Sequence, residues 1–479
     1  MSAKNDKLTD VGIDVRKRGT ISRRSMLGAG AAFCATASIA SSRVFGANER
    51  LRIGVIGTGV RGKYLIANMP EAARVVSLCD CSLAQLENTR NPEGELKEPL
   101  AEFAAGEAKA CSIYQDYRKM LDREKLDAVV IAAPDHHHAQ AMILACQAGL
   151  DIYCEKPLTV TIAEGRAMVE AAKKHKRVVQ VGSQQRTMEV NRAGCEFVRD
   201  GGLGKVSLVQ LQNFPGPMRY DGRFPTETIP KSLDWDLFCG PTELRAYNEK
   251  LWVKDAFKFG HLVWRGWDLY RDYSGHLMTN WGAHSIDMVQ YALGMDHTGP
   301  SEVWPELKLL ESFGIEIDDR WHDKTPPLGT LDDKQEDKMR YCPVSMRYAN
   351  GTVVRFDPSV GEIIFHGERG KLYMSRNNYR TEPAGLAPPI DPQTQARWKG
   401  EGHVARPHLA NWIEAIQTRT APNAPVEIGH RTATVCHLCN IMREVGRPLR
   451  WNPQDERFES DDEANRLLSR PRRKGFELP

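Results

Sequence analysis

The stretch GVIGTGVRG, residues 54–62, ends an apolar run and contains Gly57, Gly59 and Gly62. Between a strand and a helix, the first glycine allows a tight turn, the second lets the backbone approach a pyrophosphate, and the third lets the helix pack on the strand. The phosphate then lies at the positive helix N-terminus. Asp80 ends the next predicted strand, 23 residues after Gly57, where a carboxylate binds the adenosine ribose. We therefore predict a dinucleotide site that prefers NAD to NADP. The alternative is a glycine turn in an unrelated α/β fold.

Short apolar strands alternate with helical stretches up to about residue 182, which predicts a doubly wound parallel sheet, that is, an α/β Rossmann domain. We interpret the polar stretch 91–110 as an insertion. The expected strands are 51–57, 74–80, 126–134, the DIYC of 151–154 and 177–182, and the expected helices are 60–69, 139–149 and 161–175.

After about residue 183 the pattern changes to strand-like segments, and Asn350-Gly351 is a hairpin signal. This predicts an α+β domain with a large, mostly antiparallel open sheet, one face of which is exposed or covered by a partner. Residues 215–260 and 312–340 are expected to be long loops that partly cover a site. The expected strands are 205–213, 343–348, 352–357, 362–366 and 371–374, and helices 406–418 and 430–445 are expected to close the domain.

The first residues have the composition of an export signal. Arg23 and Arg24 precede an uncharged run from Leu27 to Ala40, which is too short for the roughly 20 residues that span a bilayer. The arginine pair resembles the twin-arginine type, so we expect export by that machinery to the periplasm or another extracytoplasmic space. A disordered tail or a short anchor is the alternative. The expected organisation is a signal peptide at 1–47, a Rossmann domain at 48–182, a substrate and oligomerisation domain at 183–450, and a tail at 451–479 that packs back on the protein.

Charge and cysteine content exclude two classes of partner. Residues 1–46 hold eight basic and three acidic residues, so the remainder has 57 basic and 59 acidic residues and no basic excess for nucleic acid. Cys436 and Cys439 form a lone C-x-x-C without a second pair, and we interpret them as helix thiols. Three consecutive histidines, 136–138, diverge by about 100° per residue on a helix. We therefore predict no metal site.

A lysine stands at the end of a predicted buried strand in DIYCEKPLT, residues 151–159. Lys156 lies at the carboxyl end of a central strand, where doubly wound sheets bind ligands. An ammonium group there holds a reacting hydroxyl and stabilises developing alkoxide charge. Glu155 is expected to orient the lysine or to cap a neighbouring helix. A surface ion pair is the alternative.

The glycine loop, AAPDHHHA (132–139), YCEKPLT (153–159), NWGAHSID (280–287) and APVEIGHR (424–431) together resemble the Gfo/Idh/MocA family of glucose–fructose oxidoreductase and inositol dehydrogenase. The resemblance runs from about residue 50 to the C-terminus. It implies that Lys156 lies between nicotinamide and substrate, that the peptide before Pro157 is often cis, and that one of the three histidines, His138 by the family pattern, faces the cofactor crevice. The expected cofactor residues are Gly57, Thr58, Gly59, Val60, Arg61, Gly62, Asp80, Ala133, Pro134, His138, Glu155 and Lys156.

His284 is the expected proton acceptor, because imidazole titrates near pH 6.5. Asp287 follows three residues later on the same helix face. In inositol dehydrogenase-like relatives an Asp stands four residues before this His, whereas this chain has Asn280, which cannot neutralise an imidazolium. Either Asp287 takes over, or proton transfer runs differently, or catalysis is weak. A buried core histidine is the alternative.

Five further residues are expected to reach the substrate. Gln184 and Arg186 follow the last strand of the first domain. The other three residues precede the helix of His284, and for them the alternative is loop packing. Aromatic rings and guanidinium groups suit polyols and acidic sugars. The residues are Gln184, Arg186, His261, Trp264 and Arg265.

Together these features predict an exported NAD-dependent oxidoreductase that acts on a CH–OH group of a sugar, polyol or sugar derivative. Free cofactor is scarce outside the cytoplasm, so NAD is expected to stay bound. One alternative is a glycosidase that works by transient oxidation and elimination. Another is a non-catalytic sensor of sugar and dinucleotide. By analogy with the family we expect a homodimer or homotetramer, with no nucleic acid partner and no membrane span.

Overall fold

A computed structural model describes residues 50–479 except 221, 223, 253–265, 313–338 and 399–404. The described residues belong to one compact unit. The predicted signal peptide at 1–47 and three predicted substrate residues, His261, Trp264 and Arg265, lie outside the described residues. No helix in the described part of the chain has the length and hydropathy needed to cross a bilayer.

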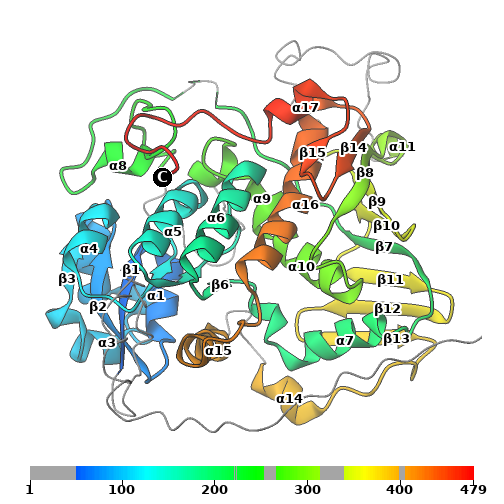
Figure 1. Ribbon diagram of the computed structural model, residues 1–479, viewed down its shortest axis with the longest axis horizontal. Coiled ribbons are helices and arrows are strands. Elements are labelled where there is room, and N and C mark those ends of the chain that lie inside the picture. The colour runs from blue at the N-terminus through cyan, green and yellow to red at the C-terminus, as the bar shows by residue number, and fades with distance from the viewer. Residues whose placement is uncertain (1–49, 221, 223, 253–265, 313–338, 399–404) are drawn as a thin grey trace, which may run out of the picture. The chain divides into compact units, whose positions relative to one another are not determined.

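The first domain is built on a six-stranded parallel sheet, as predicted (Figure 1). Its strand order is β3-β2-β1-β4-β5-β6. The order reverses between β1 and β4, and a doubly wound sheet binds its ligand at the carboxyl ends of the strands at this point. The strands are β1 (Leu51–Ile56), β2 (Ala73–Cys79), β3 (Ser112–Tyr114), β4 (Ala128–Ile131), β5 (Asp151–Cys154) and β6 (Val179–Val181).

Helices alternate with the strands of this sheet, and three of them, α2 (Leu83–Arg90), α4 (Tyr117–Arg123) and α6 (Ile162–His175), begin at a capping side chain. Ser82 accepts from the backbone N–H of Gln85, and Thr161 accepts from that of Glu164. The predicted insertion 91–110 forms short helical turns, which include α3 (Ala101–Ala105). The other helices of this part are α1 (Val60–Ala67) and α5 (His138–Gln147).

The second domain contains a nine-stranded sheet in the order β13-β12-β11-β7-β10-β9-β8-β14-β15. Every neighbouring pair is antiparallel except β7 with β10, which confirms the mostly antiparallel sheet. The strands are β7 (Val206–Gln212), β8 (Pro300–Pro305), β9 (Val344–Tyr348), β10 (Val353–Asp357), β11 (Ile363–Gly367), β12 (Gly370–Ser375), β13 (Asn378–Glu382), β14 (Leu449–Asn452) and β15 (Arg457–Phe458).

Three helices cover one face of the second sheet: α7 (Glu189–Arg199), α10 (Gly282–Ala292) and α16 (Val426–Val445). Val209, Phe356 and Phe365 of the strands pack there in one apolar core with Ile286 and Leu438 of the helices. Side chains that alternate with these core residues point to the other face and are polar or half-buried, as expected for an open sheet.

Helix α15 (Ala405–Thr418) follows the strands of the second sheet in the sequence and packs on the first domain. The ring of Trp412 lies 5.7 Å from that of Tyr153 on β5. His408 Nε2 donates to the carbonyl oxygen of Val181 over 2.9 Å. The helix therefore covers the β5–β6 edge of the parallel sheet, and only these long-range contacts reveal it.

A segment of the second domain, which we call the cap (residues 224–252 and 266–275), lies against the carboxyl ends of the parallel strands. It has an aromatic core of its own, which includes Phe238 of α8 (Trp235–Cys239). The backbone N–H of Leu83 donates to Ser232 O over 2.8 Å, just after β2. Near the end of β4, His136 and His137 both donate to Phe238 O. The cap thus contacts both sides of the predicted dinucleotide crevice.

The C-terminal segment runs across the first domain over α5 and α6 to α8 (Figure 1). Arg470 and Arg472 both bind the carboxylate of Glu164, which is 2% exposed. Arg473 donates to the carbonyl oxygen of Gly240 in the cap over 3.0 Å. These contacts tie residues 470–473 to both the first domain and the cap.

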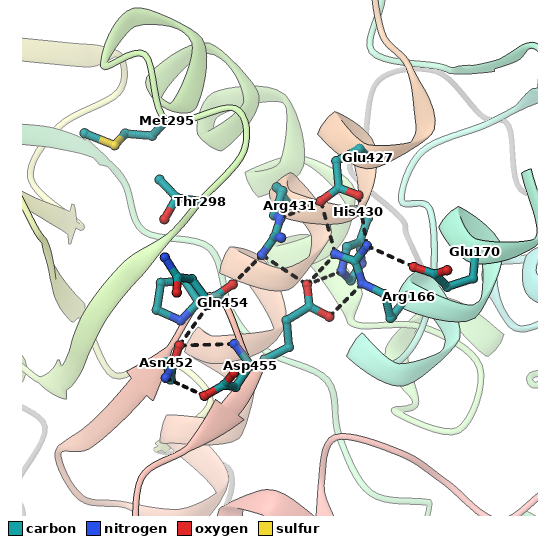
Figure 2. A network of polar contacts seen from close by, with 12 residues as sticks. Arg166, Glu170, Met295, Thr298, Glu427, His430, Arg431, Asn452, Gln454 and Asp455 are labelled. Carbon is teal, nitrogen blue, oxygen red and sulfur yellow. Dashed lines mark hydrogen bonds and ion pairs between the residues drawn. The ribbon is translucent and has the colours of Figure 1, made fainter. Parts of the chain in front are cut away.

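A polar network joins the two domains where α6, α16 and the β14–β15 hairpin meet (Figure 2). Arg166 of α6 binds Glu427 over 2.9 Å and Glu456 over 2.7 Å. Arg431 and His430 of α16 bind the same Glu456 over 3.0 Å and 2.7 Å. Glu456 therefore joins three cationic or ionisable groups from two helices.

Candidate functional site

The glycine loop between β1 and α1 has the geometry of a phosphate-binding turn. Gly57 has φ +87°, and a Cβ there would lie 2.4 Å from Ala133 N. A Cβ on Gly62 would lie 2.0 Å from Gly57 O, so the helix packs directly on the turn. A Cβ on Gly59 would meet nothing within 4 Å. The first and third glycines are therefore required by packing, whereas the second leaves open space at the helix N-terminus, as a pyrophosphate requires.

Asp80 lies at the end of β2, beside this loop. Its Oδ2 accepts from Thr58 N over 2.8 Å, and its Oδ1 accepts from Ser82 N over 2.9 Å. Burial raises the pKa of Asp80, although these hydrogen bonds oppose the change. Its Oδ2 also accepts from Thr58 Oγ1 over 3.2 Å, so Oδ1 is the oxygen left to accept from a ribose hydroxyl. The glycine loop and Asp80 thus fit the pyrophosphate and adenosine ribose of NAD.

Glu155 is an internal anchor. Arg61 Nε donates to its Oε1 over 2.7 Å, and Gln184 Nε2 donates to the same oxygen over 3.0 Å. Gln184 also donates to the hydroxyl of Tyr153 over 2.9 Å. Gln184, a predicted substrate residue, is 4% exposed. This arrangement favours a supporting role for Gln184 beneath Glu155 over direct substrate contact.

His138 connects two turns at the crevice. Its Nδ1 lies 2.9 Å from Pro157 O and its Nε2 lies 2.8 Å from Ala133 O. Both partners are carbonyl oxygens, which only accept, so both ring nitrogens donate and the ring is an imidazolium. Burial opposes this charge, but Cys154 and the two carbonyls outweigh it and raise the pKa of His138 to about 9. His138 therefore fixes the turn after β4 to the cis Lys156–Pro157 turn.

Lys156 follows β5 and contacts the second domain. Its Nζ donates to Asn280 Oδ1 over 2.7 Å and lies 3.3 Å from Asn280 O. Asn280 ends α9 (His276–Asn280) and is 6% exposed. Burial lowers the pKa of Lys156 to about 8, although Glu155 opposes the change. The structure thus joins two predicted catalytic residues across the domain boundary.

His284 lies in the first turn of α10, four residues after Asn280. The side chain is half-buried, and its ring centroid lies 6.1 Å from that of Trp281. Trp281 is 37% exposed, and the guanidinium carbon of Arg376 lies 5.8 Å over its ring. Arg376, in the turn between β12 and β13, also lies within electrostatic reach of Arg61 of the glycine loop. The neighbourhood of His284 thus offers an aromatic face and a guanidinium group, neither of which we had predicted at these positions.

Asp287 and Arg186 form an ion pair with each other. Arg186 Nε donates to Asp287 Oδ1 over 2.8 Å, and its other nitrogens bind Asp296. Thr432 Oγ1 also donates to Asp287 Oδ1, over 3.1 Å. Arg186 is 4% and Asp287 1% exposed. This arrangement favours a structural role for the pair, which joins the end of the first domain to α10, over the predicted contacts with His284 and substrate.

No group of three or more potential metal ligands occurs among the described residues. His136 and His137 instead donate from Nε2 to the same carbonyl oxygen, that of Phe238, over 2.8 Å and 2.9 Å. Burial lowers the pKa of both rings, which are therefore neutral. The pair attaches the cap to the end of β4.

Four buried polar residues were not predicted from the sequence: Asp135 and Asp268, which lie within electrostatic reach of Lys156, and Ser274 and His276, which contact them. Ser274 Oγ lies 2.7 Å from Asp135 Oδ2 and 3.2 Å from Asp268 Oδ1. Asp135 follows Pro134 in the AAPDHHHA motif, and this adjacency was the available signal. The other three lie about 130 residues later, in a stretch without a recognisable motif.

The fold and this site define a two-domain dinucleotide-binding protein of the oxidoreductase class. The chain belongs to the Gfo/Idh/MocA oxidoreductase family. Residues 51–183 match its NAD-binding Rossmann fold, and residues 169–309 and 333–478 match its C-terminal alpha/beta domain. The first domain is thus an NAD-binding domain.

Individual relatives match over shorter stretches. Inositol 2-dehydrogenase of Salmonella paratyphi B is 31% identical over 168 residues, which cover 34% of this chain and 46% of the relative. The 2,7-anhydro-N-acetylneuraminate hydratase of Mediterraneibacter gnavus is 27% identical over 154 residues, or 32% and 36% of the two chains. The match to these curated relatives thus spans less than half of their length. The WlbA dehydrogenase of Bordetella pertussis, solved with NADH and UDP-GlcNAcA, has a similar fold with a TM-score of 0.56, 16% identity and coverage of 85% and 99%.

Proposed function

We propose that this protein is an NAD-dependent oxidoreductase that moves hydride between a CH–OH carbon of a sugar, polyol or sugar derivative and nicotinamide. The contact of Lys156 with Asn280, 2.7 Å across the two domains, carries the proposal. It places an amine at the carboxyl end of β5, where the parallel sheet binds its ligand, against Asn280, which stands four residues before His284. The family and its inositol dehydrogenase relative support the same reaction.

Three residues act on the substrate in this proposal. Lys156 as an ammonium donates to Asn280 and holds the reacting oxygen with a remaining N–H, which stabilises developing alkoxide charge. His284 accepts the hydroxyl proton during oxidation and returns it during reduction. Trp281 offers its exposed ring to an apolar face of the sugar. Bound NAD supplies the hydride acceptor, held by the glycine loop and Asp80.

Two variants test the proposal. We expect Lys156→Met and His284→Ala each to lower turnover by about 10²–10⁴-fold on the best substrate of a sugar and polyol panel. NAD affinity, measured by calorimetry, should stay close to that of the wild type, because the glycine loop and Asp80 are intact. Wild-type activity in the His284 variant would remove His284 from the mechanism. Binding of sugars without any conversion by the wild type would instead indicate a sensor.

The cap favours a second candidate function. In it, the sugar is oxidised, loses its leaving group by elimination, and is then reduced again with the same bound cofactor. Asp234 N donates to Cys81 O over 2.9 Å, one residue after Asp80, so the second domain contacts the adenosine end of the crevice and would retain the dinucleotide. The hydratase relative is consistent with such chemistry. Release of a glycone or hydrated sugar without accumulation of NADH would support this cycle, whereas stoichiometric NADH would exclude it.

Export and assembly belong to the same proposal. The leader with Arg23 and Arg24 supports export by the twin-arginine route, and replacement of both arginines by lysine should retain the protein in the cytoplasm.

The open face of the second sheet supports a homodimer or homotetramer. The guanidinium group of Arg347 (β9) lies over the ring of Trp304 (β8), and that of Arg380 (β13) lies over the ring of Tyr373 (β12). A second copy of the chain would bury these aromatic side chains. Native mass spectrometry measures both the subunit number and any retained dinucleotide.

A further inference from the structure

Asp135, Asp268, Ser274 and His276 form a buried polar chain that the proposed mechanism does not use. None of the four is more than 5% exposed. Asp135 lies directly after Pro134 near the end of β4, whereas the other three come from the cap and the start of α9. Both carboxyl groups lie within electrostatic reach of Lys156. The chain therefore links the first domain, the cap and the lysine.

The hydroxyl of Ser274 limits the protonation states of this chain. Its Oγ lies 2.7 Å from Asp135 Oδ2 and 3.2 Å from Asp268 Oδ1, and it accepts from His276 N over 3.1 Å. A hydroxyl has one proton to donate and two acceptor sites. It can donate to only one of the two carboxyl groups, so the other must bring a proton of its own. The three contacts then use each donor and acceptor of Ser274 once.

The contacts of His276 favour Asp268 as the ionised carboxyl group. Its Nδ1 lies 3.0 Å from Asp268 Oδ2 and 3.2 Å from the carbonyl oxygen of the same residue. A carbonyl only accepts, so Nδ1 carries a proton and donates to Asp268 as well. Asp268 thus receives donors from His276 and Ser274, whereas Asp135 donates to Ser274. Burial and the nearby charge of Asp268 raise the pKa of Asp135, which agrees with this assignment.

We infer that Asp135 and Asp268 share one proton through Ser274 and together act as a single negative counter-charge to Lys156. The charged groups around Lys156 are then Glu155, Arg61 and this carboxyl pair, with the imidazolium of His138 at the adjoining Pro157 turn and the titratable ring of His276 on Asp268. One negative charge stabilises the ammonium against burial without the repulsion that two adjacent carboxylates would cause. Asp135 and Asp268 are positioning residues, and the role of this charge in catalysis rests on the proposed function.

Chemical labelling of Lys156 tests the inference without any substrate. Trace acetylation of the full-length protein with acetic anhydride between pH 6 and 10, read by mass spectrometry, reports the pH at which Lys156 loses its proton. Asp135→Asn and Asp268→Asn should each give a midpoint close to that of the wild type, because the remaining carboxyl group ionises and the total charge is unchanged. The double variant removes the charge, so we expect a midpoint about one pH unit lower and about tenfold more reactive amine at a given pH below it.

The outcomes separate this inference from the proposed function. If either single variant gives the full shift, or the double variant gives none, the shared proton is excluded, and the dehydrogenase assay is unaffected by that result. Glu444→Gln is the matched control, because Glu444 pairs with Arg219 and Arg271 rather than with Lys156. If the double variant does not fold, difference infrared spectra decide: a protonated carboxyl band should disappear in Asp135→Asn and persist in Glu444→Gln, and its absence from the wild type would overturn the inference.

Discussion

Lys156 Nζ lies 2.7 Å from Asn280 Oδ1, so the amine of the first domain is held by a neutral amide of the second. The resemblance to inositol dehydrogenase-like proteins implies an Asp at the position of Asn280 in those relatives. A carboxylate there would stabilise the ammonium form, whereas the amide orients it without adding charge. The pKa of Lys156, lowered to about 8 by burial, should therefore respond to a charge placed at position 280.

Asn280→Asp should raise the pKa of Lys156. The ammonium form is present below this pKa, so wild-type turnover should decline above about pH 8, and the variant should keep its activity to a pH at least about one unit higher. Acetylation of Lys156 and the alkaline limb of kcat/KM measure the same change independently. Asn280→Ser, which adds no charge, is the control, and an unchanged alkaline limb in the Asp variant would contradict the assigned role of Lys156.

Gly59 and Gly62 distinguish cofactor binding from packing. Gly59→Ala adds a Cβ that meets no protein atom within 4 Å, and Gly59 has φ −63°, which alanine readily adopts. We expect unchanged thermal stability and at least about tenfold weaker NAD binding, or about 1.4 kcal/mol, because the methyl group occupies the space for the pyrophosphate.

Gly62→Ala is the matched comparison. Its Cβ would lie 2.0 Å from Gly57 O, so we expect the free energy of unfolding to fall by about 1–3 kcal/mol. Thermal melts of the apo proteins and NAD titrations measure the two effects. Normal NAD affinity in Gly59→Ala would place the pyrophosphate elsewhere.

The sequence predicted the nucleotide half best, because its signals are local. Each of these site residues follows an apolar strand: the glycines of the loop, Asp80 and Lys156. The strand, the turn and the helix around each of them can therefore be predicted from one short segment of sequence. Strands such as β3 and β15 were missed because three and two residues respectively are too short for a pattern. Helix α15 was predicted, but its packing on the first domain was not, because its partner Tyr153 lies more than 250 residues earlier.

The polar contacts around the site could not be predicted, because their partners lie far apart in the sequence. Arg186 and Asp287 each look like substrate residues in isolation, since a charged side chain near a site motif suggests function. Only the fold shows that they are buried against each other, 101 positions apart. The contacts of Ser274 with Asp135 and Asp268 likewise depend on the cap folding onto the first domain.

Asp80 should determine the choice between the two nicotinamide dinucleotides. Asp80→Ala removes the hydrogen bond that the carboxylate would make to a ribose hydroxyl, worth about 1.5–3 kcal/mol for a charged hydrogen bond, so NAD should bind about ten- to a hundredfold more weakly. NADP binding should change less or improve, because the repulsion of its 2′-phosphate is removed. Asp80→Asn is the control, since it retains an acceptor for Thr58 N. Tighter binding of NADP than NAD by the wild type would contradict the preference.

Glu456 should make the stability of the protein sensitive to acid. His430 and Arg166 donate to its carboxylate (Figure 2), and although burial opposes them, these partners lower the pKa of Glu456 to about 2. A carboxyl group with a lowered folded-state pKa stabilises the fold above its unfolded pKa of about 4.3. This stability is lost as the pH falls from about 4.3 to about 2.

Glu456→Gln tests this account, because the variant lacks the carboxylate at every pH. We expect the free energy of unfolding to fall by about 2 kcal/mol near neutral pH and the difference from the wild type to vanish towards pH 2, as measured by urea denaturation. Burial also lowers the pKa of His430, so this ring adds a separate loss of stability below its unfolded pKa of about 6.5. Glu459→Gln, at an exposed position three residues later, is the control. An equal, pH-independent loss in both variants would show that the network does not depend on the charge of Glu456.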